Sequence, residues 1–169
     1  MKKFGYSNPM AVPKLTKITL NSSFGKLVVN KTSGEREKVQ KFILQDLAAI
    51  SGQQPKLVAS KKSIAGFNLR EGLEIAAMVT LRKQRMWDFL ERFIYVSLPR
   101  SRDFKGLDST SIDTKGNMSI GFREHISFPE ILVEKEKTIF GLQVTISTTA
   151  KSKEEGLELL RLIGLPIKT

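Results

Sequence analysis

The chain has 169 residues, of which 40% are hydrophobic, so it is long and apolar enough for one domain with a sizeable core and is not largely disordered. Its 28 Lys and Arg against 17 Asp and Glu give a net charge of +11, which attracts polyanions and makes nucleic acid the first partner to consider. The absence of cysteine excludes disulfides and thiolate chemistry, and a single histidine forms no metal cluster by itself. No window of about 18 apolar residues is present that could span a bilayer, so we expect no membrane partner. We also expect no cofactor.

The cations are unevenly distributed along the chain. Residues 1–34 contain six lysines and no acid, and residues 47–70 contain four cations and no acid. These two segments are therefore the first candidates for contact with an anionic partner.

The first predicted strand covers residues 14–21. Thr16, Ile18 and Leu20 alternate with polar residues that begin at Lys17, a pattern that predicts one core face and one basic, hydrogen-bonding face. The polar face ends at Asn21.

A helix is predicted to follow this strand. Thr32 and Glu35 form a capping-box signature, and apolar residues then recur at helical spacing until Gly52. Residues 73–82 return to strict alternation, which predicts a second two-faced strand.

The next predicted helix covers residues 84–98. Its apolar residues from Met86 to Phe93 are expected to face the core, and Pro99 is expected to lie beyond its end. Trp87 on the same helix is more typical of a core residue than of a stacking platform.

Two further alternating strands are predicted at residues 117–123 and 142–149, and a last helix begins at Ser152 with Glu155 as its capping partner. Helices and strands that do not strictly alternate favour an α+β, two-layer domain. We predict one domain over residues 1–169, with a mostly antiparallel sheet that has one helix-packed face and one open face that is poor in acids.

Catalytic motifs are weak. The phosphate-binding loop GxxxxGK[ST] is absent, residues 115–122 match the RRM aromatic motif only in part, and one histidine permits no Ser/His/Asp set. His125 is more typical of a half-buried packing residue than of a general base, and Glu154 and Glu155 are explained by the dipole at a helix N-terminus. We expect no enzyme.

Six blocks of the sequence resemble one known family. They are VPKLTKITLN, LAAISGQQP, KKSIAGFNLREG, VTLRKQRMWDFLERFIYVSLPRSRDFKGL, GNMSIGFREHISFPEI and TTAKSKEEG. In this order they resemble the bacterial-type large-subunit ribosomal protein five, the family that binds 5S rRNA in the central protuberance. The resemblance runs from about Tyr6 to Pro166.

The resemblance implies a structural, RNA-binding protein of the large ribosomal subunit. Asn21, Gln53 and Thr80 match family positions that contact ribosomal RNA, although residues of these types also suit turns and strands. Phosphate contacts are then expected from four cations, which are Lys14, Lys17, Arg82 and Arg85.

In the family, the segment at residues 61–72 is a mobile loop that reaches the peptidyl-site tRNA. The residues expected to contact the tRNA are Lys61, Lys62, Ser63, Gly66, Phe67 and Arg70. The resemblance implies that Phe67 packs on nucleic acid, and the alternative is that it lies in the domain's own core. The other partners that the resemblance implies are large-subunit rRNA and neighbouring ribosomal proteins, including small-subunit protein thirteen.

Some features depart from the family. A helix that normally precedes VPK is not found, and the segment after Asn21 is longer than usual, with Lys26 where an acid is common. These departures slightly favour the mitochondrial matrix over the bacterial cytoplasm. A free-standing RNA-binding module outside the ribosome is the alternative function.

Overall fold

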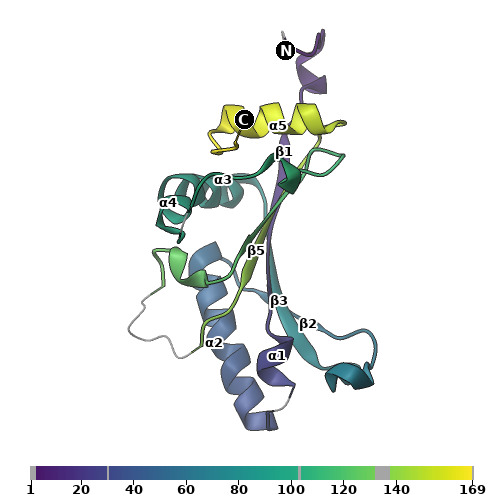
Figure 1. The fold of residues 1–169 in the computed structure, drawn as a ribbon, viewed down its shortest axis with the longest axis vertical. Coiled ribbons are helices and arrows are strands. Elements are labelled where there is room, and N and C mark those ends of the chain that lie inside the picture. The colour runs from purple at the N-terminus through teal and green to yellow at the C-terminus, as the bar shows by residue number, and fades with distance from the viewer. Residues whose placement is uncertain (1–2, 30, 103, 132–137, 169) are drawn as a thin grey trace.

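The protein contains one five-stranded antiparallel sheet with the strand order β2-β3-β1-β5-β4 (Figure 1). The computed structural model describes residues 3–29, 31–102, 104–131 and 138–168. The strands are β1 (Leu15–Ser23), β2 (Lys56–Ala59), β3 (Glu74–Leu81), β4 (Met118–Phe122) and β5 (Leu142–Thr148). The four predicted strands are confirmed, and β2 is an additional strand that pairs with β3.

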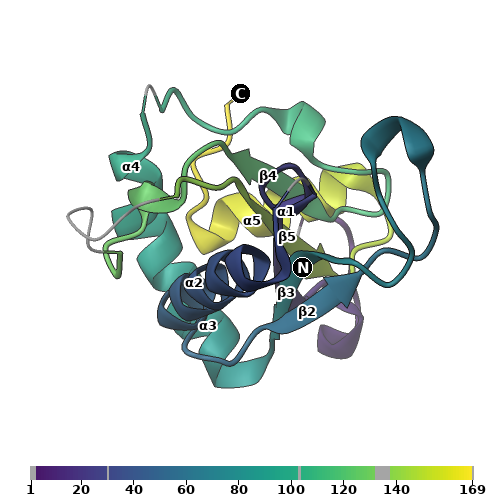
Figure 2. The same ribbon diagram turned by 90° about the horizontal axis from the view of Figure 1, so that it is seen from below.

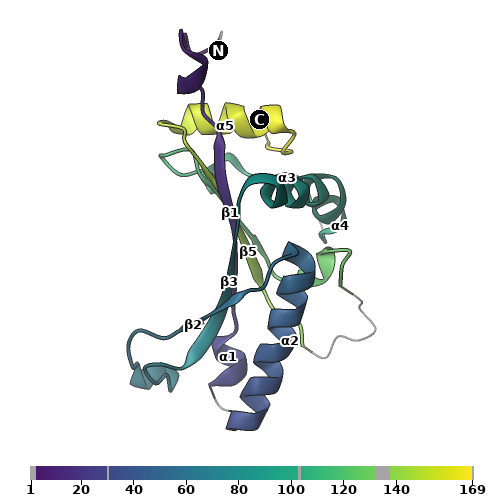
Figure 3. The ribbon, with the colours of Figure 1, turned by 180° about the vertical axis from the view of Figure 1, so that it is seen from behind.

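The helices are α1 (Gly25–Val28), α2 (Ser33–Ser51), α3 (Lys83–Arg92), α4 (Leu98–Arg100) and α5 (Lys153–Ile163). A π-helical segment, η3 (Phe93–Ser97), joins α3 to α4, and short 3-10 turns are η1 (Pro9–Ala11), η2 (Ala65–Phe67), η4 (Ser109–Ser111) and η5 (His125–Ser127). Figure 3 shows α2 and α3 on one side of the sheet, with the β2–β3 hairpin leaning to the other side. Among the described residues, no helix combines the length and hydropathy required of a membrane span.

The core lies between the sheet and this helical layer. Ile18 and Leu20 of β1 are fully buried, and Phe93 of η3 stacks on Phe89 at 5.7 Å and meets the ring of Phe122 on β4 edge-on. Such aromatic pairs add to the stabilisation that comes from burial alone. The predicted α+β, two-layer architecture with one packed sheet face is therefore confirmed.

The start and end of β1 differ from the sequence prediction. Thr16 is exposed, not on the core face, because the register with β5 shifts between Leu15 and Lys17, and an extra residue at a bulge reverses the alternation. Asn21 does not end the strand, since β1 continues to Ser23.

The prediction that Trp87 is a core residue is wrong. Trp87 is 47% exposed, because the buried stripe of α3 follows the spacing of Met86, Phe89 and Leu90 and leaves the next position outside it. Pro99 also lies inside the helical segment and not beyond it. It stands at the start of α4, where a missing backbone N–H is tolerated.

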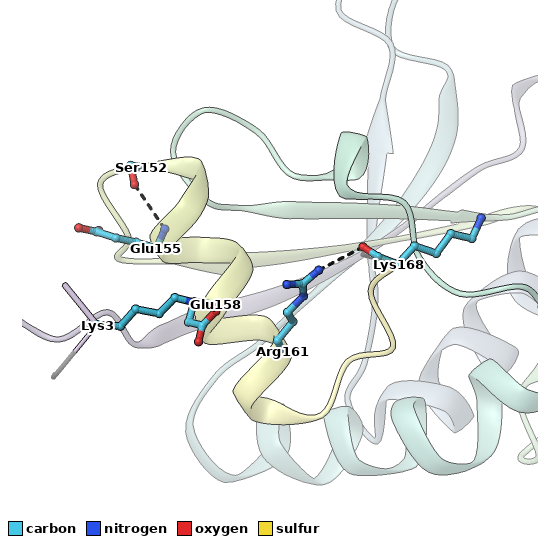
Figure 4. A network of polar contacts seen from close by, with 6 residues as sticks. All are labelled: Lys3, Ser152, Glu155, Glu158, Arg161 and Lys168. Carbon is cyan, nitrogen blue, oxygen red and sulfur yellow. Dashed lines mark hydrogen bonds and ion pairs between the residues drawn. The ribbon is translucent and has the colours of Figure 1, made fainter.

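The predicted last helix is confirmed as α5 (Figure 4). The Ser152 hydroxyl accepts a hydrogen bond from the Glu155 amide at 3.3 Å, and Gly164, with φ of 104°, ends the helix. Lys3 forms an ion pair with Glu158 at 2.6 Å, so residues far apart in the sequence are joined at this end of the molecule.

Two glycines fix the distance between α5 and the turn before β4. A β-carbon on Gly156 would lie against the backbone of Gly116, and one on Gly116 would lie 2.7 Å from the β-carbon of Ala150. The backbones therefore pack directly against each other without side chains between them.

We predict that Gly156→Ala lowers the free energy of unfolding by about 3 kcal/mol or more, because backbone atoms cannot move aside as a flexible side chain would. Gly34→Ala is the matched control, since a β-carbon at Gly34 meets no atom within 4 Å. Urea unfolding of both variants measures the effect. Equal stability of the two variants would contradict the close approach.

A buried polar pair ties the segment after β4 to α2. The His125 ring is fully buried and stacks on Phe140 at 3.7 Å, and its Nε2 lies 3.5 Å from Asp46 Oδ2. The backbone amide of Phe140 donates to Nδ1 at 3.4 Å. Burial raises the pKa of Asp46 to about 6 and lowers the pKa of His125. The packing role predicted for His125 is confirmed, with complete rather than half burial.

The free energy of unfolding of the Asp46→Asn variant should rise relative to that of the parent as the pH rises. A carboxyl whose folded-state pKa is raised keeps its proton in the folded protein after the unfolded chain has lost it, so the parent loses stability between about pH 4 and pH 6. The variant has no such loss. The difference in free energy of unfolding should grow by up to about 3 kcal/mol over this range, measured by denaturant titration at several pH values. His125 lies 3.5 Å from Asp46, so the comparison is repeated in a His125→Phe background, where only the carboxyl of the pair titrates. A difference that stays constant with pH in both backgrounds would refute the prediction.

Candidate nucleic-acid interface

The face of the sheet opposite α2 and α3 carries polar side chains in rows across the strands. In one row, Thr80 of β3, Thr19 of β1, Thr145 of β5 and Ser119 of β4 are successive register partners. The hydroxyl groups of Ser119 and Thr145 are 3.2 Å apart. This row therefore presents hydroxyl groups across four strands, each able to donate and to accept a hydrogen bond.

A second row lies beside the first and contains the predicted residue Asn21. Asn21 pairs with Met78 on β3 and with Gln143 on β5, and Gln143 pairs in turn with Gly121 on the edge strand β4. Neither row contains an acidic residue. These two rows can therefore approach an anionic partner without like-charge repulsion from within them.

The corner between β3 and α3 gathers four of the predicted residues. The Gln53 side-chain amide donates to the carbonyl oxygen of Thr80 at 3.4 Å, and Arg85 donates to the Gln53 side-chain oxygen, also at 3.4 Å. Arg82, which lies between Thr80 and Arg85 in the sequence, is exposed. The backbone turns at Lys83, whose φ of 52° is unusual for a residue other than glycine. Gln53 thus holds an arginine beside the edge of the polar face.

Lys17 and Lys14 extend this basic corner along β1. The register pairs Ile18 with Leu81, which places Lys17 next to the position of Arg82. Lys14 is exposed, and its backbone exchanges hydrogen bonds with Thr149 beyond β5. The seven predicted rRNA-binding residues therefore lie on the open face or at the corner and strand end that border it.

Residues 61–72 form the tip of the β2–β3 hairpin, at the opposite end of β3 from this corner. Ile64 and Leu69 exchange backbone hydrogen bonds at 2.9 and 3.1 Å, and the Ser63 hydroxyl donates to the carbonyl oxygen of Leu69. Phe67 is 73% exposed. The alternative that Phe67 lies in the domain's own core is therefore wrong.

Sequence reasoning did not single out several residues of this surface. Thr19 and Thr145 share the first polar row with Thr80, and Gln143 shares the second with Asn21. Their alternation with buried neighbours is visible in the sequence, but only the strand order brings them together. Metal binding has no comparable basis, because the described parts of the chain contain no group of three His, Cys, Asp or Glu placed to hold an ion.

Comparison with known proteins matches both parts of the chain to one family. Residues 8–70 match Ribosomal protein L5, and residues 74–167 match the C-terminus of the same ribosomal family. The chain belongs to the ribosomal protein L5 family. This is a family of structural proteins without enzymatic activity, in agreement with the prediction that the chain is not an enzyme.

Similar proteins cover nearly the whole chain. It is 50% identical over 167 residues to the large ribosomal subunit protein uL5 of Colwellia psychrerythraea, covering 99% of the chain and 89% of that protein. It is 49% identical over 165 residues to the protein of the same name from Desulforapulum autotrophicum, with 98% and 89% covered. The match in Geotalea uraniireducens is 48% identical over 168 residues, with 99% and 90% covered. These relatives are bacterial and give no support to the predicted mitochondrial preference.

Proposed function

We propose that this chain, a structural constituent of the large ribosomal subunit, binds 5S rRNA with the open face of its sheet. The acid-free rows of hydroxyl and amide groups carry this proposal. They lie beside a corner where Lys17, Arg82 and Arg85 supply positive charge. Cations that contact phosphates set affinity and position, while the polar rows can hydrogen-bond to sugars and base edges.

The second part of the proposal assigns the hairpin tip to peptidyl-site tRNA. Lys61, Lys62 and Arg70 are exposed around the exposed ring of Phe67, a combination that suits phosphate contact together with packing on a nucleotide. The tip lies at the far end of β3 from the basic corner, so it can reach a different RNA. We further propose that it is a mobile loop, as the family resemblance implies.

The bacterial relatives favour a bacterial ribosome as the location. Contacts with large-subunit rRNA and with small-subunit protein thirteen remain part of the proposal and rest on the resemblance to the family. A free-standing RNA-binding module would share the charge and the open face, but it would not sediment with large subunits on a sucrose gradient.

Asn21→Ala and Thr80→Val should each weaken binding to a 5S rRNA transcript by about 1 to 3 kcal/mol, because each removes a hydrogen-bonding group that would be buried on assembly. Thr114→Val is the matched control, since Thr114 is exposed in the turn before β4 and away from both polar rows. Fluorescence anisotropy titrations measure the affinities. If Asn21→Ala and Thr80→Val both fold and bind the transcript normally, the open face is not part of the RNA interface.

The triple change Phe67→Ala, Lys61→Ala and Lys62→Ala should leave incorporation into large subunits intact and weaken peptidyl-site tRNA binding. Loss of the aromatic contact alone is expected to cost about 1 to 3 kcal/mol. Gradient-purified particles are assayed for tRNA retention. The control triple change is Leu162→Ala, Lys38→Ala and Lys41→Ala. It removes the same charge from α2 and an 80% exposed apolar side chain from α5. Normal tRNA retention with depleted incorporation would identify the loop as a tether instead.

A further inference from the structure

A basic trough lies along β4, the edge strand farthest from β2 in the sheet. One depression of about 410 Å³ is lined by residues that include Ser101, Arg102 and Arg123, and a second of about 330 Å³ adds Lys105 and Lys168. Among the residues that the structure describes, four cations line the trough, and Glu124 is its one acidic residue. Figure 2 shows the chain after α4 passing along the β4 side of the sheet.

Most of these cations are exposed. Arg102, Lys105 and Arg123 are exposed and lie outside the ion pairs formed within the described part of the chain. Lys168 is the exception, because it pairs with Asp108 at 2.9 Å. Within the described residues, three cations without an ion-pair partner are thus spread over two adjoining depressions, and they create a local field that favours a polyanion.

The trough is continuous with the open face of the sheet. A third depression, on the open face, is lined by Asn21, Ser119 and Gln143. All three depressions share Gly121 and Phe122 in their walls. A β-carbon at Gly121 would meet no atom within 4 Å, and its φ is not positive. Packing and backbone conformation therefore do not require glycine here. Its effect is that no side chain covers the backbone of β4 at this position.

We infer that an RNA backbone crosses β4 at Gly121, passing between the open sheet face and the basic trough. The inference rests on the proposed function for the half of this path that lies on the open face. The trough half rests on its own cations, because phosphodiester groups repeat along a strand and can contact Arg123, Arg102 and Lys105 in turn. Gly121 lets the backbone of the RNA approach the protein backbone at the crossing.

Gly121→Glu tests the crossing directly, because it places a carboxylate at the crossing and a β-carbon at Gly121 meets no atom within 4 Å. Gly121→Gln has the same size without the charge, and Gly34→Glu adds the same charge in the first turn of α2. The probes are a 5S rRNA transcript and large-subunit rRNA from which 5S rRNA has been removed. Gly121→Glu should lose about tenfold in affinity for at least one probe, and both controls should lose far less. The probe that loses affinity identifies the source of the strand.

Arg102→Gln combined with Arg123→Gln provides a second measurement. If both arginines contact phosphates of the same probe, the slope of log affinity against log salt concentration should become shallower by about 1.5. Unchanged affinity of Gly121→Glu for both probes, with an unchanged melting temperature, would overturn the inference.

Failure of this inference is distinguishable from failure of the proposed function. If Asn21→Ala weakens 5S rRNA binding while Gly121→Glu binds both probes normally, the open-face proposal stands and the crossing at β4 is refuted. If Arg102→Gln combined with Arg123→Gln weakens binding while Asn21→Ala does not, the trough contacts RNA and the open-face assignment fails.

Discussion

The central position of β1 determines how the rest of the protein is arranged. β1 is hydrogen-bonded to β3 on one side and to β5 on the other, so its alternation of buried and polar residues is imposed on both neighbours. Ile18 and Leu20 face the helices, and the side chains between them necessarily face away. A one-residue shift of this strand would exchange the two faces, which makes its register a strict requirement.

The two faces carry different tasks as a result. The helical layer buries the apolar face through Phe89, Phe93 and the residues around them, while the opposite face stays free of helices and of acids in its two polar rows. A sheet with one solvated face can thus supply both a stable core and a hydrogen-bonding surface. The net charge of +11 strengthens the attraction of such a surface for RNA, but the positions of the cations decide where RNA can bind.

Those positions are spread around the sheet. Lys17, Arg82 and Arg85 lie at one corner, Lys61 and Lys62 lie at the hairpin tip, and Arg102 and Arg123 lie at the β4 edge. The sheet separates these groups, and it fixes the distance between the corner and the β4 edge, whereas the hairpin tip extends beyond the end of β3. Under the proposed function, the separated groups contact different RNA segments.

The sequence by itself determined the local elements and the two-faced strands. The capping box at Thr32, the termination of α2 at Gly52 and the alternation along β3 depend on neighbours within a few residues, so they can be read from spacing. The resemblance of sequence blocks to a ribosomal family was visible at the same level, and the family was then shown by comparison. The exposure of Trp87 follows from the same kind of local spacing, whereas the exposure of Thr16 depends on the register shift against β5 and could not be predicted in this way.

Only the tertiary structure decided the features that join distant parts of the chain. The link from Gln53 to Thr80 and Arg85, the close approach of Gly116 to Gly156, and the meeting of three depressions at Gly121 each depend on which strands and helices become neighbours. Strand order, the bulge in β1 and the π-helical turn after α3 result from packing over the whole core. Local periodicity is a property of the backbone, whereas these contacts are set by the packing of segments far apart in the sequence.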